Sequence, residues 1–141
     1  MKKRSYELIE HTADIAIRVK GKDLKELFKK AALAMFDLCA ERIHKTTTSK
    51  RKEFLIRLKA VNVEELFVNW LNELLSLSAV KLKVFCDFKF KTLTQECLEA
   101  IATGCDIDGY KIHTEIKAAT YHELSVKKTR AGWVAQVIFD V

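Results

Sequence analysis

The sequence predicts an α+β fold, a single-domain sandwich over residues 1–141 in which two main helices pack on a largely antiparallel β-sheet. Three observations support this prediction. The length of 141 residues is typical of one domain. Two stretches repeat their apolar residues with the period of a helix, and the second half of the chain alternates apolar and polar residues as strands do. Apolar residues make up 49% and charged residues 31%, which is ordinary globular composition.

The first third of the chain predicts a strand followed by a helix. Apolar residues alternate with polar or small ones over 15–20, before Gly21, which is typical of a strand with one wet face. Asp23 and Glu26 then have the spacing of a capping box, so we expect a helix over 24–40. Its apolar stripe consists of Leu24, Leu27, Phe28, Ala31, Met35 and Leu38.

A second strand and helix follow. Residues 44–52 are rich in threonine and have the composition of a loop, and alternation over 54–59 predicts a strand. Asn62 and Glu65 repeat the capping pattern, so we expect a helix over 63–78 at the centre of the core. Its apolar stripe consists of Val63, Leu66, Phe67, Trp70, Leu71, Leu74, Leu75 and Leu77.

The second half of the chain predicts strands. Alternation over 82–90 places one set of side chains on the buried face, and lysines lie largely opposite. The buried set is Leu82, Val84, Cys86, Phe88 and Phe90. We further expect strands over 96–103, 112–121, 123–127 and 133–141, a turn over 106–109 and a hairpin connection over 129–132.

Charge and hydropathy limit the partners and the cellular location that the sequence allows. The net charge of +6 and the pI of about 9.1 favour acidic partners, but the lysines are spread along the whole chain, so RNA contact is expected to be weak or indirect. No apolar run approaches the roughly 20 residues that span a bilayer. Glu7, Glu10 and His11 interrupt the apolar segment that a signal peptide needs. We expect a cytoplasmic protein with no membrane contact.

The four cysteines are Cys39, Cys86, Cys97 and Cys105. They form no Cys-x-x-Cys pair, so the sequence indicates neither a zinc knuckle nor a redox motif. We expect buried, reduced thiols.

Two aspartates stand where structure alone favours other residues. Asp14 ends a polar opening segment, and Asp140 follows Phe139 in an apolar terminal strand, although aspartate is depleted in strands. Exposure near a fraying chain end explains Asp140 equally well. If the two carboxylates approach within about 4 Å, their repulsion costs on the order of 4 kcal/mol, and a shared proton or a cation would relieve it. Oxygen ligands, including a terminal carboxylate on Val141, select Ca²⁺, Mg²⁺ or Mn²⁺.

The histidines give a weaker indication. His11 lies near Asp14, with His113 and His122 as distant partners, and this spacing fits no standard pair of zinc ligands. A lone histidine is more often a hydrogen-bonded structural residue. No glycine-rich phosphate loop or serine nucleophile motif occurs.

Residues 117–122 combine a cation, a hydroxyl group, an aromatic ring and an imidazole. These residues have two explanations of equal weight: a functional role, or a purely structural strand in which they alternate between the two faces. Lys117 also stands where an EF-hand loop that begins at Asp106 needs glutamate, which excludes calcium binding in that loop. We take His11, Lys117 and His122 as candidate supporting or partner-contacting residues.

Several motifs occur in one order along the chain. They are Tyr6 with His11-Thr12-Ala13-Asp14-Ile15, Leu24-x-x-Leu27-Phe28-x-x-Ala31-Ala32, Leu66-Phe67-Val68-Asn69-Trp70-Leu71-Asn72-Glu73-Leu74-Leu75, Ile116-Lys117-Ala118-Ala119-Thr120-Tyr121-His122, and Trp133-Val134-Ala135-Gln136-Val137-Ile138-Phe139-Asp140-Val141. Through these motifs the chain resembles the archease family along essentially its whole length. The main departure is Cys105 after Gly104, where the family usually has glutamate, so a supporting acidic residue is in question there.

The resemblance implies an accessory protein, not an enzyme, that activates the GTP-dependent RtcB-type RNA ligase of tRNA splicing. Archeases promote guanylylation of the ligase's active-site histidine, sustain its turnover and broaden its nucleotide use. The family's metal ligands correspond to Asp14, Asp140 and Val141, the last through a main-chain or terminal oxygen. Ca²⁺ is the favoured ion, with Mg²⁺ and Mn²⁺ as alternatives.

Two other classes of function stay open on the sequence. The chain could be a metal-dependent phosphoester hydrolase, with Asp14 and Asp140 holding the cation and His11 or His122 as the general base. It could also be an RNA chaperone that acts through its basic surface. The oligomeric state and the surface that meets the ligase cannot be read from the residues.

Overall fold

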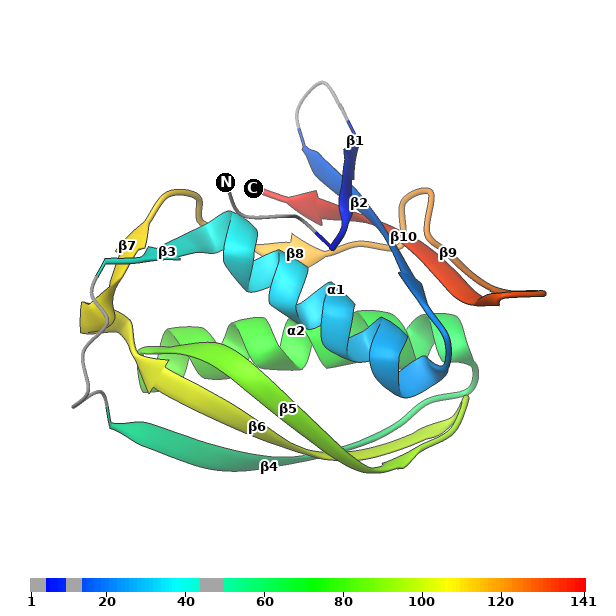
Figure 1. Cartoon of the computed structure of the whole chain (residues 1–141), viewed down its shortest axis with the longest axis horizontal. Coiled ribbons are helices and arrows are strands. Elements are labelled where there is room, and N and C mark those ends of the chain that lie inside the picture. The colour runs from blue at the N-terminus through cyan, green and yellow to red at the C-terminus, as the bar shows by residue number, and fades with distance from the viewer. Residues whose placement is uncertain (1–4, 10–13, 44–49) are drawn as a thin grey trace.

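The computed structural model describes residues 5–9, 14–43 and 50–141. The helices are α1 (Leu24–Cys39) and α2 (Val63–Lys81), with a 3-10 turn η1 (Ile107–Gly109). The strands are β1 (Glu7–Ile9), β2 (Ile15–Gly21), β3 (Ala40–Arg42), β4 (Arg51–Lys59), β5 (Lys83–Leu93), β6 (Cys97–Asp106), β7 (Tyr110–Ile112), β8 (Ala118–Ala119), β9 (Ser125–Thr129) and β10 (Gly132–Asp140). Figure 1 shows the two helices between a five-stranded and a three-stranded sheet. The predicted α+β sandwich is confirmed.

The five-stranded sheet is organised around β10. Strand β2 pairs with one edge of β10, and β8 and β9 pair with the other edge. Strand β1 extends the sheet beyond β2, and every pairing is antiparallel. The predicted hairpin is present, because Thr129 of β9 pairs with Gly132 of β10. The first and last parts of the chain therefore share one sheet.

The three-stranded sheet has β6 at its centre, between β4 and β5. Strand β4 pairs with β6 without interruption from Arg51 to Lys59, which is longer than the predicted 54–59. The predicted strand over 96–103 is confirmed as part of β6. The short strands β3 and β7, which the sequence analysis did not predict, form a ladder of their own.

Both helices begin at the predicted caps. The Asp23 carboxylate accepts a hydrogen bond from the backbone N–H of Glu26 at 2.9 Å. The Asn62 side chain accepts one from the N–H of Glu65 at 2.8 Å, so each cap satisfies a donor that the first helical turn leaves free. Helix α2 continues to Lys81, three residues past the predicted end.

The core is centred on Trp70, as its place in the apolar stripe predicts. Its side chain is fully buried, and Nε1 donates a hydrogen bond to the carbonyl oxygen of Phe28 at 3.1 Å. The ring also meets Phe88 edge-on, with 5.4 Å between ring centroids. Burying one large apolar side chain stabilises the fold by roughly 1.5–3 kcal/mol. Among the described residues, none that is polar or charged is fully buried.

The prediction of a long strand over 112–121 is wrong. Strand β7 ends at Ile112, and the chain then crosses from the β3–β7 ladder to the five-stranded sheet. The N–H of His113 bonds the carbonyl oxygen of Cys39 at 2.8 Å during this crossing. Strand pairing resumes over the two residues of β8, which belong to the five-stranded sheet. The segment predicted as one strand therefore contributes to two different sheets.

The predicted alternation over 82–90 is also partly wrong. Leu82, expected in the core, has 60% of its surface exposed, because it adopts the left-handed conformation (φ 55°) that ends α2. A β-bulge between Phe85 and Asp87 leaves Cys86 as an extra residue in β5. Both Val84 and Phe85 are therefore buried. A bulge of this kind leaves no signal in a pattern of period two.

In the part of the chain that the structure describes, no helix is long and apolar enough to cross a membrane.

Candidate functional site

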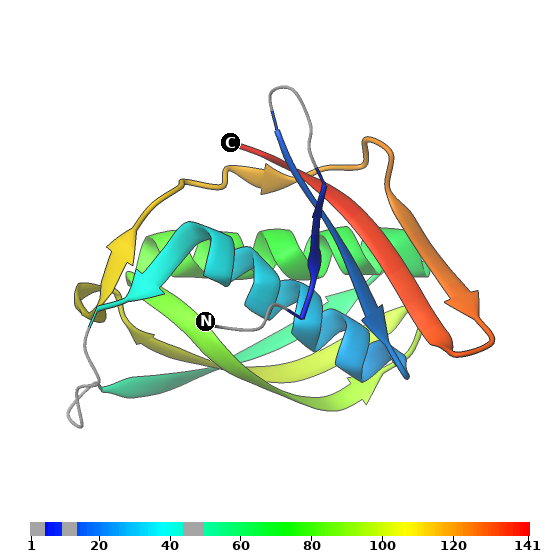
Figure 2. The ribbon, with the colours of Figure 1, turned by 45° about the horizontal axis from the view of Figure 1, so that its top comes forward.

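The pairing of β2 with β10 brings Asp14 and Asp140 to one end of a ladder. The last pair of this antiparallel ladder is Ile15 with Phe139. Asp14 precedes Ile15 and Asp140 follows Phe139, so the same register continued by one position sets the two aspartates opposite each other. Opposed residues of an antiparallel pair point to the same face of a sheet. Figure 2 shows the start of β2 and the end of β10 on the same upper side of the molecule.

Strand β8 holds the other edge of β10 at this position. Ala118 pairs with Asp140, and the backbone N–H of Lys117 donates to the carbonyl oxygen of Asp140 at 2.8 Å. Thr120 adds two bonds to the carbonyl oxygen of Ile138, from its N–H at 3.0 Å and from its hydroxyl at 2.8 Å. These contacts fix the main chain of β10 up to Asp140, so the carboxylate extends from an anchored backbone.

Asn72, a residue that the sequence analysis gave no role, anchors β8 in turn. Its side-chain oxygen accepts a hydrogen bond from the N–H of Ala119 at 2.7 Å, and its amide nitrogen donates to the carbonyl oxygen of Ala119 at 3.1 Å. Asparagine is a poor residue for a helix interior. Its presence in the middle of α2 was the signal that could have indicated this role.

The acid pair offers oxygen atoms as ligands. Asp140 is exposed and Asp14 is half-buried, so water reaches this end of the ladder. Within the described ranges, no three histidine, cysteine, aspartate or glutamate side chains gather to hold a metal ion. Two carboxylates with a backbone oxygen of Val141 fit a hard cation that keeps much of its water, and they lack the histidine or cysteine ligands that zinc sites in proteins commonly include.

The three candidate supporting residues fall in different places. The backbone of Lys117 contacts that of Asp140, as described above. His122 is exposed and lies in the turn between β8 and β9, where the N–H of Leu124 bonds the carbonyl oxygen of Tyr121 at 3.2 Å. His11 lies outside the described residues. Cys105, at the family's glutamate position, is in β6 and so in a different sheet from the acid pair.

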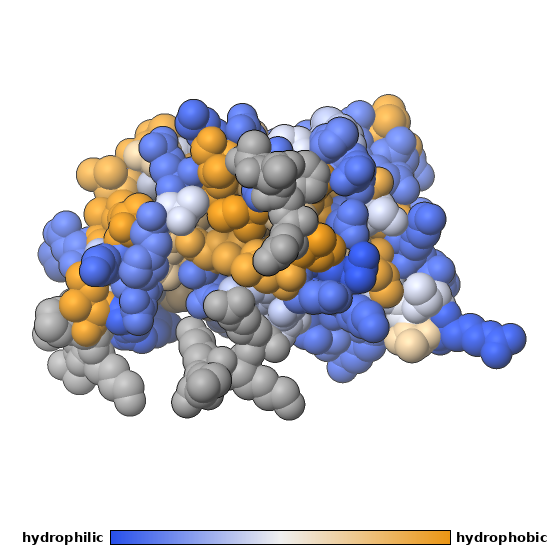
Figure 3. Space-filling view, turned by 90° about the horizontal axis from the view of Figure 1, so that it is seen from above, coloured by the Kyte–Doolittle hydropathy of each residue, from blue (hydrophilic) through white to orange (hydrophobic). Residues whose placement is uncertain are grey.

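Hydrophobic side chains are exposed on the upper side of the molecule. Figure 3 looks onto this face from above and shows hydrophobic residues gathered at its centre, between hydrophilic ones. Leu8 of β1 has 47% of its surface exposed, and Val141, directly after β10, has 37% exposed. Exposed apolar surface next to charged groups is typical of a surface that meets another protein.

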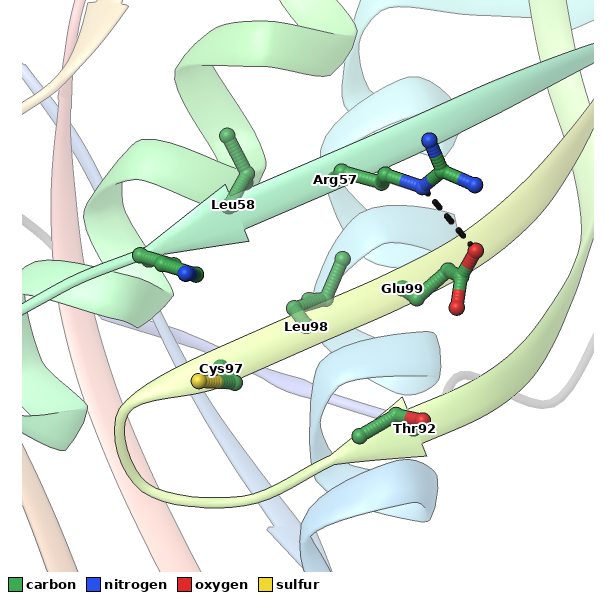
Figure 4. A pocket seen from close by; sticks show the side chains of 7 residues that line it. Arg57, Leu58, Thr92, Cys97, Leu98 and Glu99 are labelled. Carbon is green, nitrogen blue, oxygen red and sulfur yellow. Dashed lines mark hydrogen bonds and ion pairs between the residues drawn. The ribbon is translucent and has the colours of Figure 1, made fainter.

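A separate pocket of about 400 Å³ lies on the three-stranded sheet. Figure 4 shows its lining residues, with Arg57 of β4 and Glu99 of β6 joined by an ion pair of 3.0 Å. These two residues are also partners in the β4–β6 ladder, so the ion pair is part of the cross-strand packing. The pocket contains none of the predicted site residues.

Comparison with known proteins gives a family match over nearly the whole chain. Residues 6–141 match the model of the Archease protein family (MTH1598/TM1083). The protein archease of Methanosarcina barkeri is 37% identical over 144 residues, which cover 98% of this chain and 97% of that protein. The protein archease of Saccharolobus islandicus strain M.14.25 is 40% identical over 146 residues, which cover 98% and 99%.

Solved structures agree with this match. The solution structure of protein 1598 of Methanobacterium thermoautotrophicum is similar with a TM-score of 0.69 and 26% identity, covering 99% of this chain and 100% of that one. The crystal structure of an archease from Thermotoga maritima, described as a possible chaperone, is similar with a TM-score of 0.68 and 27% identity, covering 100% and 98%. The chain therefore belongs to the archease family.

Proposed function

We propose that this archease is an accessory protein that activates the GTP-dependent RtcB-type RNA ligase of tRNA splicing. It promotes guanylylation of the ligase and sustains its turnover, and it broadens the ligase's use of nucleotides. The action depends on a divalent cation held by Asp14, Asp140 and a backbone oxygen of Val141, with Ca²⁺ favoured over Mg²⁺ and Mn²⁺. Membership of the archease family supports the accessory role.

The register of β2 against β10 is the observation that carries the metal-dependent part of the proposal. Continued one position beyond its last pair, Ile15 with Phe139, this register would bring Asp14 opposite Asp140, although the two residues are far apart in the sequence. Two carboxylates on one face of a ladder repel each other, and a bound cation removes that repulsion. Neither strand needs an aspartate at this position for packing, because the apolar contacts of the ladder end with Ile15 and Phe139.

A bound cation would supply positive charge for the phosphate oxygens of a nucleotide. The residues of this chain contribute its placement. Asn72 anchors β8, and β8 fixes the backbone of Asp140, so the exposed carboxylate is held at a defined point of the surface. Exposure of this end to solvent leaves room for a partner's nucleotide pocket. Lys117 is exposed, its backbone bonds that of Asp140, and its ammonium group is suited to contact phosphate.

Exposed hydrophobic side chains support a protein partner. Leu8 of β1 and Val141, which directly follows β10, are both exposed at the surface. Such residues stabilise a protein interface when they are buried in it, and they add little to the binding of a small charged substrate. This favours the activator over an independent hydrolase.

The proposal is tested with a guanylylation assay that uses purified RtcB-type ligase, GTP and a divalent salt. Asp14→Ala and Asp140→Ala are each expected to reduce the acceleration by about tenfold or more, as changes at metal sites commonly do. The matched control is Asp108→Ala, which removes an exposed carboxylate from η1 and leaves the acceleration unchanged. Full acceleration by both site variants would contradict the proposal. The archease alone, incubated with phosphoesters and the same ions, is expected to release no product.

A further inference from the structure

Two thiols meet between β5 and β6, away from the acid pair. The sulphur atoms of Cys86 and Cys105 lie 3.1 Å apart, and both cysteines are free. Cys105 is buried with 3% of its surface exposed, whereas Cys86 is half-buried and so reaches solvent. Neither residue belongs to the proposed metal site.

The β-bulge explains why these two residues meet. The ladder pairs Cys105 with Val84, and without a bulge Cys86 would face the residue two places before Cys105. The register shift after Phe85 makes Cys86 an extra residue of β5. Its thiol turns toward β6, 3.6 Å from the carbonyl oxygen of Thr103 and within reach of Cys105. The bulge thereby places two thiols side by side that a regular ladder would not.

We propose that Cys86 and Cys105 are a site of reversible oxidation, at which exchange with a low-molecular-weight disulfide forms an intramolecular disulfide bond. A disulfide has an S–S length of about 2.05 Å, so the two sulphur atoms need to approach by about 1 Å. Cys86 and Cys105 lie on adjacent, paired strands of one sheet. The bond joins an edge strand to the central strand of its sheet.

The exchange proceeds in two steps that balance. The Cys86 thiol loses its proton to solvent, and the thiolate attacks one sulphur of the small disulfide, which releases a small thiolate. The Cys105 thiol then loses its proton, and its sulphur attacks Cys86 Sγ and releases the second small thiolate. Two protein thiols are oxidised to one disulfide, and one small disulfide is reduced to two thiols. Cys86 reacts first because it is the exposed member of the pair.

The surroundings make this exchange slow at neutral pH. The pKa of the Cys86 thiol is raised to about 11, mainly by burial and then by the neighbouring Cys105 thiol; Asp87 also raises this pKa, whereas Arg51 lowers it. Tyr110 of β7 also hydrogen-bonds Cys105, and the pKa of its hydroxyl is raised to about 12, mainly by burial and then by the neighbouring Cys105. The thiolate is the reactive form, and a raised pKa leaves little thiolate at neutral pH. The two thiols therefore oxidise only with an excess of oxidant and a long incubation.

The test equilibrates the full chain with oxidised and reduced glutathione at pH 8 and alkylates the remaining thiols after denaturation. We expect two of the four thiols to escape alkylation at the oxidised limit, and peptide mapping to link Cys86 to Cys105. The bond is expected to raise the melting temperature by about 5–10 °C, because it cross-links the unfolded chain. Cys86→Ser abolishes both effects, whereas Cys97→Ser, a matched change in the same sheet, preserves them.

Three results would overturn the proposal. They are four alkylated thiols at the oxidised limit, a glutathione adduct that persists on Cys86, and a disulfide that involves Cys39 or Cys97. Each is read from the mass or the peptide map of the unvaried protein, so the outcome does not depend on whether a cysteine variant folds.

Discussion

Asn72 and Ala119 are joined by two hydrogen bonds, so that one side-chain amide holds both the donor and the acceptor of one residue of β8. The bond to the side-chain oxygen is 2.7 Å long and the bond from the side-chain nitrogen is 3.1 Å long. Ala119 in turn pairs with Phe139, directly before Asp140. Helix α2 is thus connected to the candidate metal site through the two-residue strand β8.

Replacement of Asn72 by leucine should therefore weaken both the fold and the site. Loss of two partly buried hydrogen bonds costs about 2 kcal/mol of unfolding free energy, because the backbone groups of Ala119 lose their partners. We also expect weaker metal binding, since the backbone of Asp140 is less firmly held. Urea unfolding and metal titration measure the two effects. The control is Ser76→Ala on the exposed face of the same helix. Equal stability of the two variants would contradict the role given to Asn72.

Gly132 should not tolerate a side chain. It has a φ of +137°, and a Cβ atom at this position would lie 2.2 Å from the carbonyl oxygen of Gly21. Gly132→Ala is expected to destabilise the protein by more than about 2 kcal/mol, because the β9–β10 turn or the end of β2 must shift. In contrast, Gly109→Ala meets no atom within 4 Å and should change stability by less than about 1 kcal/mol. Thermal unfolding of both variants checks the difference, and similar losses would show that the turn can adjust.

Stability should fall as the pH rises from about 9 to 11. Burial raises the pKa of the Cys39 thiol from 9.0 to about 11, and burial is also the main cause of the equal rise at Cys86. Because the folded pKa is above the unfolded one, the folded state keeps protons that the unfolded chain releases in this range. The contribution is complete below pH 9 and is lost by about pH 11. Urea unfolding at several pH values measures the slope, and Cys39→Ser should reduce it. An unchanged slope in that variant would argue against the shift at Cys39.

The sequence was sufficient for the elements that rest on local chemistry. Helices α1 and α2 were predicted from the caps at Asp23 and Asn62 and from apolar stripes, and the structure has both caps. Asp14 and Asp140 were singled out because each stands where structure alone favours another residue, and their sharing of a metal ion stays a prediction. Periodicity and placement of charge carry this information in single stretches of chain.

Features that depend on contacts between distant segments could not be predicted. The crossing after Ile112 is set by bonds to the carbonyl oxygen of Cys39, which no local pattern encodes. The meeting of Cys86 with Cys105 requires a bulge, and the role of Asn72 requires a partner 47 residues away. In each case the role of the residue depends on tertiary contacts and not on its local sequence.

The most direct test of the proposed site is calorimetric titration of the metal-free protein with Ca²⁺, and then with Mg²⁺ and Mn²⁺. The account predicts that the unvaried chain binds a single ion, and that Asp14→Asn and Asp140→Asn each weaken binding by about tenfold or more without loss of fold, because each removes one charged ligand from a shared ion. Asp108→Asn, which alters an exposed carboxylate of η1, should bind the ion as the unvaried protein does. Undiminished binding by either site variant, while the fold is intact, would contradict the claim that Asp14 and Asp140 hold one ion.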